Sequence, residues 1–308
     1  MDAPRAQPPK RRPGRHDVPP PVIAGAGSSI VDLHTHTTRS DGVLEPTALV
    51  HDVAAAGVRM LAVTDHDTLG GYRELRTSGA VPAGLELIAG VEINAIARGI
   101  PLADGELHIL GYGMDPDDEA FEAILARQRA ARRVRFERTL ARLRDVGMPI
   151  DTQVASIDLS RDDAIGRPTI ARALIAAGHA DSVEDAFQRL IGWGGPAYVP
   201  REGLGPIEAI HAISGAGGLP ALAHFSEAPG QIPLLRELRD AGLRGLEVYY
   251  RSFSQESVTM VAAVADLLGL VATGGSDYHG DLMSYAATHA SLGVPATVAD
   301  RLREALAS

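Results

Sequence analysis

Histidines and carboxylates recur in this sequence in short motifs that suit divalent metal ions. The stretch from Ile30 to Gly42 reads I-V-D-L-H-T-H-T-T-R-S-D-G, and it places His34 and His36 two residues apart after a short apolar segment. Side chains two apart on an extended backbone point to the same side, so both imidazoles can face one ion. Asp41 follows in a Ser-Asp-Gly turn, where Gly42 frees the backbone to bring this carboxylate back over the same place. The stretch therefore predicts one edge of a metal site.

The same residue types recur with later apolar segments. His66 lies in T-D-H-D directly after one such segment, and Glu92 lies inside another, where a buried carboxylate needs a strong partner. One such residue alone would more often be a hydrogen-bonded core residue, but nine of them in one recurring pattern are poorly explained by chance. Nine ligands suit two or three ions, with Glu92 able to bridge. The candidate metal ligands, which are also the candidate catalytic residues, are His34, His36, Asp41, His66, Glu92, His108, His224, Asp277 and His279.

The composition narrows the chemistry. The chain has 308 residues, 45% of them hydrophobic, and no cysteine. This excludes disulfides, thiol nucleophiles, zinc–thiolate sites and iron–sulfur clusters, and ligation by imidazole and carboxylate suits manganese first, with zinc or iron as alternatives. The formal net charge of −10 argues against a surface that coats nucleic acid. No Gly-x-Ser-x-Gly or Gly-x-x-x-x-Gly-Lys motif occurs, so an acyl-enzyme or a nucleoside triphosphatase would lack its usual parts.

Neither a long apolar run nor a secretory leader is present, so we expect a cytoplasmic protein without membrane contact. Nothing in the sequence indicates an obligate protein partner.

Seven apolar segments are predicted to be strands, and helical segments separate most of them. The helix at 46–56 begins at Pro46 and ends before Gly57, and the strands on either side of it form a strand–helix–strand unit with parallel pairing. Polar residues gather at or near the strand ends. This pattern is typical of a β/α barrel with its site at the C-terminal face, whereas an open doubly wound sheet would concentrate ligands at one switch point. The predicted strands begin near residues 30, 59, 85, 106, 220, 246 and 270.

Composition and pattern divide the chain into four regions. Residues 1–28 hold seven prolines and the basic cluster Lys10-Arg11-Arg12, and they are predicted to be a disordered tail. The barrel is expected in two parts, 29–114 and 197–308. Residues 115–196 show helical patterns only, at 118–144, 168–177 and 182–191, up to the Gly-Trp-Gly-Gly-Pro breaker at 192–196. We interpret this region as an inserted helical subdomain that acts as a lid.

Taken together, the motifs resemble a known family. D-L-H-T-H-T, S-D-G, T-D-H-D, G-V-E, H-I-L-G-Y, A-H-F and G-S-D-Y-H occur in this order from Ile30 onward, as in the polymerase-and-histidinol-phosphatase (PHP) superfamily of metal-dependent phosphoesterases. The resemblance implies a distorted seven-stranded TIM-like β/α barrel with a trinuclear site. By position it assigns ligands to three ions: His34, His36, Glu92 and Asp277 to one; Glu92, His108 and His224 to a second; Asp41, His66 and His279 to a third.

The helical insertion and the G-R-P motif at 166–168 are most similar to one subgroup, which removes the 3′-phosphate from nucleoside 3′,5′-bisphosphates and includes 5′-to-3′ exoribonucleases. A histidine often follows that Arg-Pro in the subgroup, and here the residue is Thr169. We therefore expect a phosphoric ester hydrolase that releases the terminal 3′-phosphate of a small nucleotide. Clustered ions would lower the pKa of a water and present it as hydroxide in line with phosphorus.

Three other functions remain open. A 5′-to-3′ exoribonuclease acting on short RNA is favoured by eight arginines between 127 and 144, although an ordinary amphipathic helix would leave these arginines exposed or paired. A phosphatase of the histidinol-phosphatase type, acting on another small monoester, is the second. A non-catalytic metal-binding barrel is the third, and the full set of ligands counts against it.

Further residues are assigned to the substrate and to support of the ligands. Arg167, at the start of an insertion helix, is the main candidate to bind a phosphate through its planar guanidinium, and Arg39 and Ser276 are the others. Arg98 and Arg251 are expected to form surface ion pairs. The residues expected to orient ligand imidazoles are Asp65, Asp67 and Glu247, together with Ser276.

Overall fold

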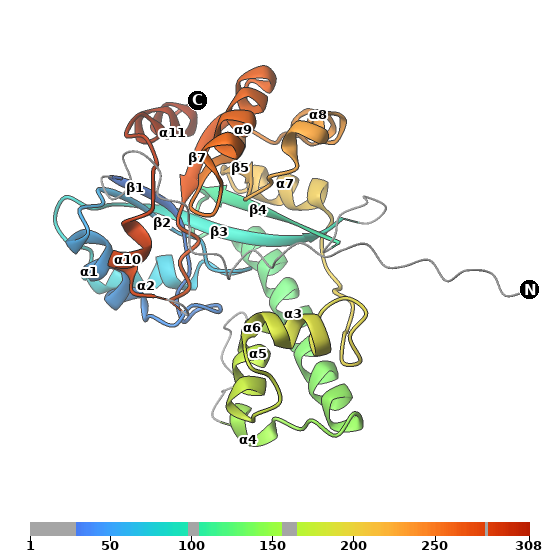
Figure 1. Cartoon of the computed structure of the whole chain (residues 1–308). Coiled ribbons are helices and arrows are strands. Elements are labelled where there is room, and N and C mark those ends of the chain that lie inside the picture. Colours follow the sequence, from blue (N-terminus) through green and yellow to red (C-terminus); the bar gives the residue numbers. More distant parts are fainter. Residues whose placement is uncertain (1–28, 98–104, 156–164, 281–282) are drawn as a thin grey trace, which may run out of the picture.

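The computed structural model describes residues 29–97, 105–155, 165–280 and 283–308. The predicted tail at 1–28 and Arg98 lie outside these ranges. Seven strands form a single sheet in chain order, and the sheet curls until its first and last strands lie side by side (Figure 1). The predicted α/β barrel is confirmed. The strands are β1 (Val31–Thr35), β2 (Met60–Val63), β3 (Glu86–Ile96), β4 (Glu106–Tyr112), β5 (Leu219–Leu222), β6 (Gly245–Tyr250) and β7 (Val271–Gly275).

The barrel is distorted because one strand runs against the others. β3 and β4 are consecutive strands that pair antiparallel, and β4 is antiparallel to β5 as well, while the remaining pairs are parallel. The first residues of β4 therefore lie at the end of the barrel where the parallel strands finish. His108, the third residue of β4, pairs with Asn94 near the end of β3. This reversal brings His108 to the same face as ligands that follow parallel strands.

The barrel closes where β7 meets β1. The contact includes a parallel bridge between Thr35 and Tyr278 and a hydrogen bond of 2.9 Å from the His36 amide to the Tyr278 carbonyl. A Cβ atom on Gly275 would lie 2.4 Å from the backbone nitrogen of His34, much closer than real Cβ contacts. Only glycine fits this close approach of two backbones.

Helices cover the outside of the barrel. A buried cluster around Leu33, Met60, Leu110 and Leu219 packs four strands together with residues 292–302, and further apolar clusters include residues of the other helices. The sequence patterns do not indicate α2. The helices around the barrel are α1 (Pro46–Ala55), α2 (Gly70–Ser78), α7 (Pro206–Gly215), the 3₁₀ turn η2 (Ala228–Gly230), α8 (Ile232–Asp240), α9 (Gln255–Leu268), α10 (Tyr285–His289) and α11 (Thr297–Leu306).

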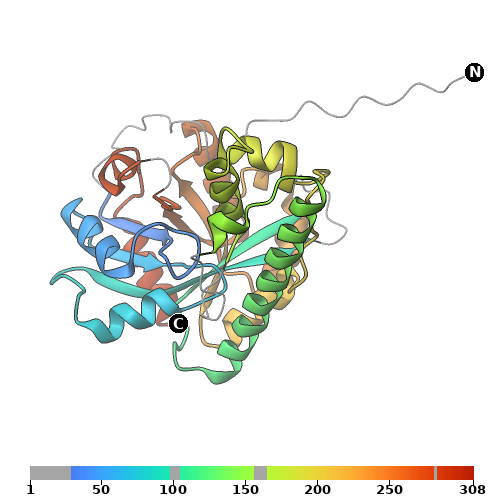
Figure 2. The ribbon, with the colours of Figure 1, turned by 90° about the horizontal axis from the view of Figure 1, so that it is seen from below.

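A group of helices between β4 and β5 projects from the barrel (Figures 1 and 2). Its longest helix spans two cores, because Phe121 and Leu125 pack with the barrel helices, whereas Phe136 and Leu140 pack in a separate apolar cluster of the insertion. Among the described residues, no helix is both long enough and apolar enough to cross a membrane. The helices of the insertion are α3 (Glu119–Asp145), α4 (Asp151–Val154), α5 (Arg167–Ala176), α6 (Val183–Ala186) and the π-helical turn η1 (Phe187–Ile191).

Candidate metal centre

The H-T-H motif leaves β1 as the sequence predicts. His34 is in the strand and His36 directly follows it; both are fully buried, and their ring centroids are 5.2 Å apart. The loop then turns back sharply, with the Gly42 amide donating to the Thr37 carbonyl at 3.0 Å. A Cβ on Gly42 would lie 2.5 Å from the His36 carbonyl oxygen. Glycine is needed here for close packing of the backbone, and this packing carries Asp41 over the site.

Glu92 is the centre of the arrangement. It is fully buried in β3, and its two carboxylate oxygens face different histidines. Oε2 lies 3.0 Å from Nδ1 of His66 and also faces the H-T-H motif, while Oε1 lies 2.7 Å from Nδ1 of His108 and 3.3 Å from Nε2 of His224. A carboxylate in this position can bridge two ions.

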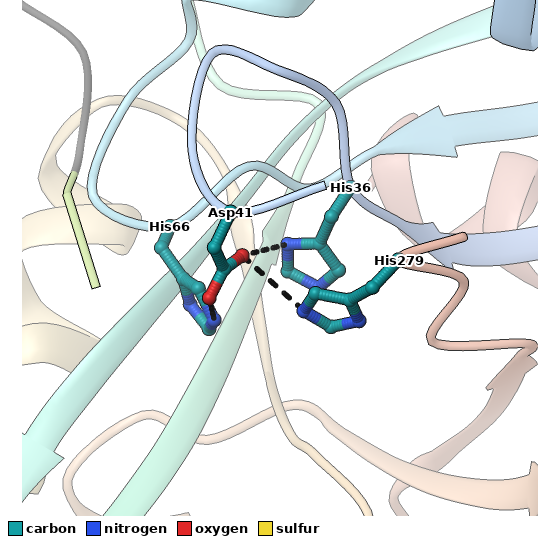
Figure 3. A group of neighbouring side chains, drawn as sticks. All are labelled: His36, Asp41, His66 and His279. Atoms are coloured by element: carbon teal, nitrogen blue, oxygen red, sulfur yellow. Dashed lines mark ion pairs between the residues drawn. The ribbon is translucent and has the colours of Figure 1, made fainter. Parts of the chain in front are cut away.

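All nine predicted ligands come together in three overlapping groups, within each of which one ligand atom per residue lies within 4.8 Å of the others. Figure 3 shows the group in which Asp41 faces three imidazoles from three loops. Relative to the assignment implied by the family resemblance, this group gains His36. The groups are His36, Asp41, His66 and His279; His34, His36, Glu92 and Asp277; and Glu92, His108 and His224.

Backbone strain marks the same place. Asp67, His224 and Asp277 are the non-glycine residues with positive φ in the described part of the chain, at 52°, 30° and 48°. Such conformations cost free energy and are concentrated at functional sites, where the surrounding structure enforces them. His224 and Asp277 are predicted ligands, and Asp67 directly follows one.

Burial and neighbouring charges set the protonation of the groups. Burial lowers the pKa of His66 to about 3. Burial also disfavours a charged His36, but the carboxylates of Asp277 and Glu92 raise its pKa to about 10. Burial alone would raise the pKa of Asp41, whereas the imidazoles of His66 and His279 hold it well below its usual range. Neighbouring imidazoles hold the pKa values of Glu92 and Asp277 low in the same way, so these three ligand carboxylates stay ionised and supply negative charge for cations.

The donor set fits divalent ions. Buried atoms without a hydrogen-bond partner in the described structure include Nε2 of His34, both ring nitrogens of His36, Nδ1 of His66, Oδ1 of Asp41 and Oε2 of Glu92. Buried polar atoms normally have partners, and atoms that converge without hydrogen-bonding are typical of shared metal ligation. Imidazole and carboxylate groups therefore form clusters able to bind metal here.

Buried residues hold the ligands in place. Glu247, predicted to orient an imidazole, accepts from the His34 ring Nδ1 at 3.0 Å and from the His224 amide at 2.7 Å. Asp32, which the sequence analysis did not single out, accepts from the Tyr285 hydroxyl at 2.8 Å and from the Ser276 amide at 2.9 Å. Asp32 thereby ties β1 to the turn that carries Asp277.

Several other assignments differ from the structure. Arg39, expected at the substrate, bonds Glu74 on α2 and Glu45. Ser276 is fully buried, and its hydroxyl donates to the backbone carbonyl of His34, so it bonds the backbone of β1 and not a ligand imidazole. Asp65 accepts from Thr37 and Ser40 and so braces the loop after β1 without bonding an imidazole directly. These residues follow or flank the motifs in sequence, but the hydrogen bonds of their side chains go to groups other than the ligand imidazoles.

Asp67 was expected to orient a ligand imidazole, but its carboxylate accepts hydrogen bonds from Arg132 and Arg201 instead. Arg132 belongs to the arginine-rich helix α3, whose arginines were expected to be exposed or paired. Arg129, Arg132 and Arg135 are paired with carboxylates, but they are buried between the two cores that α3 spans. No apolar pattern reveals this, although the three-residue spacing of the three arginines places them on one face.

Arg167 lies at the first turn of α5, close to the metal groups. Its Nη2 is 3.4 Å from Oε1 of Glu106, and its guanidinium lies 5.1 Å from the centre of the Phe187 ring. A Cβ on the preceding Gly166 would lie 3.2 Å from Oδ2 of Asp41, which shows how near α5 comes to the cluster. Asn94, Glu106 and Arg201 complete the polar surroundings and were not predicted.

Comparison with known proteins agrees with this geometry. A family model described as the PHP domain matches residues 32–190. A 3′,5′-nucleoside bisphosphate phosphatase of Chromobacterium violaceum is 32% identical over 257 residues, which cover 81% of this chain and 87% of that protein. The chain belongs to the PHP family. A 5′-3′ exoribonuclease of Haemophilus influenzae is 34% identical to this PHP protein over 254 residues, covering 80% of the chain and 89% of the relative.

A solved structure agrees with the fold as well. A Bifidobacterium adolescentis protein, described as a candidate metal-dependent phosphoesterase, superposes with a TM-score of 0.76 at 33% identity and covers 90% of this chain and 95% of its own. The reaction class of this PHP protein is therefore metal-dependent hydrolysis of phosphate esters, as expected from the sequence.

Proposed function

We propose that this PHP protein hydrolyses the 3′-phosphate of nucleoside 3′,5′-bisphosphates, with the nine clustered residues holding two or three divalent ions, manganese before zinc or iron. When bound, such ions supply Lewis-acid charge and lower the pKa of the attacking water. The chain's own residues fix where this happens: Glu92 joins the groups, and Glu247 orients His34. The name of the Chromobacterium relative supports the substrate.

One observation carries the choice of a bisphosphate, namely an excess of guanidinium groups, three of them buried and one half-buried, beside the metal groups. Four arginines, Arg132, Arg135, Arg167 and Arg201, contact only two carboxylates there, those of Asp67 and Glu106, within the part of the chain that the structure describes. Isolated buried charges are costly, so an excess of two positive charges suits a dianion. The second phosphate of a bisphosphate is such a group.

Three of these arginines have the donors to bind it. Burial and the nearby Arg167 lower the pKa of Arg135 to about 9, and burial with Arg132 lowers that of Arg201 to about 10. Nη2 of Arg135 and Nε of Arg201 are buried without a hydrogen-bond partner among the described residues. We call Arg135, Arg167 and Arg201 the anchor. Glu106 pairs with Arg135 and Arg167; burial alone would raise its pKa, but the nearby arginines lower it to about 2.

The anchor favours a terminal phosphate. The side chains of Arg135 and Arg201 are only 9% and 7% exposed. An internal phosphodiester carries a nucleotide on both sides, so the chain would have to leave this buried place in two directions. A 5′-phosphate in the anchor would place the next ester, at the 3′ position, toward the metal groups. The same geometry serves a 5′-phosphorylated RNA, whose first 3′ linkage takes the place of the 3′-phosphate. The exoribonuclease relative makes this our second candidate.

A phosphate-release assay with manganese tests the proposal. We expect a nucleoside 3′,5′-bisphosphate to be hydrolysed with a kcat/KM far above that of a nucleoside 5′-monophosphate, a nucleoside 3′-monophosphate or histidinol phosphate. A His34→Ala variant is the inactive control. Equal rates on the 3′-monophosphate and the bisphosphate would refute the second-phosphate anchor. Faster release of mononucleotides from 5′-phosphorylated RNA than of phosphate from the bisphosphate would make the exoribonuclease the main activity.

A further inference from the structure

The insertion bonds two loops that carry ligands of the same metal group. This group, His36, Asp41, His66 and His279, is the one drawn in Figure 3, and we call it the loop group. The other two groups depend more on residues inside strands, with His34 in β1, Glu92 in β3 and His108 in β4. The loop group has no ligand within a strand, because all four of its members follow one. Its geometry therefore needs another support.

The His66 loop is fastened through Asp67. Arg132 donates from Nε to Oδ2 of Asp67, Arg201 donates to the same oxygen at 2.9 Å, and Arg129 donates to the Asp67 carbonyl at 3.0 Å. Arg129 and Arg132 belong to α3 of the insertion. Asp67 directly follows His66. Its backbone is in the left-handed region, and its amide N–H donates a hydrogen bond to the Glu92 carbonyl, so Asp67 has little conformational freedom. A shift of α3 relative to the barrel would therefore move His66.

The Asp41 loop is fastened by a second helix of the insertion. Nη2 of Arg172 in α5 donates to the Asp41 carbonyl at 3.0 Å. Gly166, immediately before α5, packs so closely that a Cβ there would lie 3.2 Å from Oδ2 of Asp41 and 3.6 Å from Nη1 of Arg132. Two ligands of the loop group thus receive their position from α3 and α5, which pack together in the core of the insertion.

We propose that Arg132 and Arg172 are positioning residues that couple docking of the insertion to metal binding at the loop group. The inference rests on the proposed metal occupancy of the site, but not on the proposed substrate. The insertion contributes no ligand to the loop group, but its arginines then hold two of the ligands of this group in position. Outer residues that orient metal ligands typically contribute 10- to 100-fold to metal affinity, and we expect this size of effect.

The experiment measures manganese binding to the full chain by calorimetry and by metal analysis after equilibrium dialysis. Arg132→Gln and Arg172→Gln should each weaken the binding of one ion per chain by about 10- to 100-fold and leave the binding of the others unchanged. Arg144→Gln is the matched control, because Arg144 is an exposed arginine at the end of α3 that pairs with Asp151 inside the insertion. Asp67 keeps Arg201 as a partner in Arg132→Gln, so we expect the metal-free variant to melt within a few degrees of the native protein.

Removing a ligand of the loop group separates the coupling from a general effect. In an Asp41→Asn background the binding of the same ion is already weakened, so adding Arg132→Gln should reduce its affinity little further. Equal weakening of every ion, or native affinities in both arginine variants, would overturn the proposal. No metal binding by the native chain would instead refute the proposed metal centre itself, and a failure of the substrate assay with normal metal binding would leave this inference standing.

Discussion

Arg167→Ala is the change that most directly tests the second-phosphate anchor. Among the described residues, the guanidinium has one long contact with a carboxylate, 3.4 Å from Nη2 to Oε1 of Glu106, and it lies over the Phe187 ring. Its side chain is 23% exposed, more than those of Arg135 and Arg201, so it is the anchor residue that a ligand reaches first. Removal of the side chain opens no cavity in the barrel core.

The size of the effect follows from the bonds that would be lost. A guanidinium can form two parallel bonds to a phosphate, and a hydrogen bond to a charged group contributes about 1.5–3 kcal/mol. Arg135 and Arg201 would still hold part of the phosphate, so we expect a loss equivalent to one such bond and not to two. A loss of about 1.5–3 kcal/mol in transition-state stabilisation lowers kcat/KM about 10- to 150-fold.

Two substrates distinguish an anchor from a structural role. With a nucleoside 3′,5′-bisphosphate, Arg167→Ala should show the full loss in kcat/KM, whereas hydrolysis of a simple aryl phosphate, which has no second phosphate, should hardly change. Arg172→Ala on the same helix is the matched control, because Arg172 bonds the Asp41 carbonyl and should affect both substrates alike through the metal group. Equal losses for Arg167→Ala on both substrates would show that it supports the fold or the metals, and the anchor would have to be abandoned.

Two further predictions concern metal binding and the closure of the barrel. Neighbouring carboxylates raise the pKa of His36 to about 10 in the metal-free protein, so at pH 7.5 its imidazole is protonated and must release a proton to bind an ion. Manganese affinity should therefore rise with pH by about tenfold per unit below that pKa, and calorimetry in buffers of different ionisation enthalpy should detect the proton; pH-independent affinity would contradict this. Gly275→Ala should destabilise the fold by about 1–3 kcal/mol in urea unfolding, because its Cβ would lie 2.4 Å from the His34 nitrogen, while Gly215→Ala, with open space around it, should not. If Gly275→Ala unfolds at the same urea concentration as the native protein, the contact between β1 and β7 is not tightly packed.

The sequence alone determined the kind of fold and the set of residues that gather at its site. Ligand spacing is local information: a strand fixes the side to which His34 and His36 point, and the glycine of the Ser-Asp-Gly turn fixes the return of Asp41. Parallel strands end at one face, so residues after several strands must meet there. The reversal of β4 was not predicted, yet it left the prediction intact because His108 lies near the start of that strand.

Only the tertiary structure decided which charged residues support or surround this site. Arg39 and Ser276 lie beside ligand motifs in sequence, but Arg39 pairs with Glu74 and the Ser276 hydroxyl faces a backbone carbonyl. Arg132 and Arg201 are far from His66 in sequence, and they reach Asp67 only because α3 and the segment before α7 both pack against the loop after β2. An arginine's solvation and partners depend on such long-range packing, and in one sequence a buried arginine looks the same as an exposed one. Long-range packing therefore decided which arginines lie at the site, whereas the strands and the turns after them decided the metal ligands.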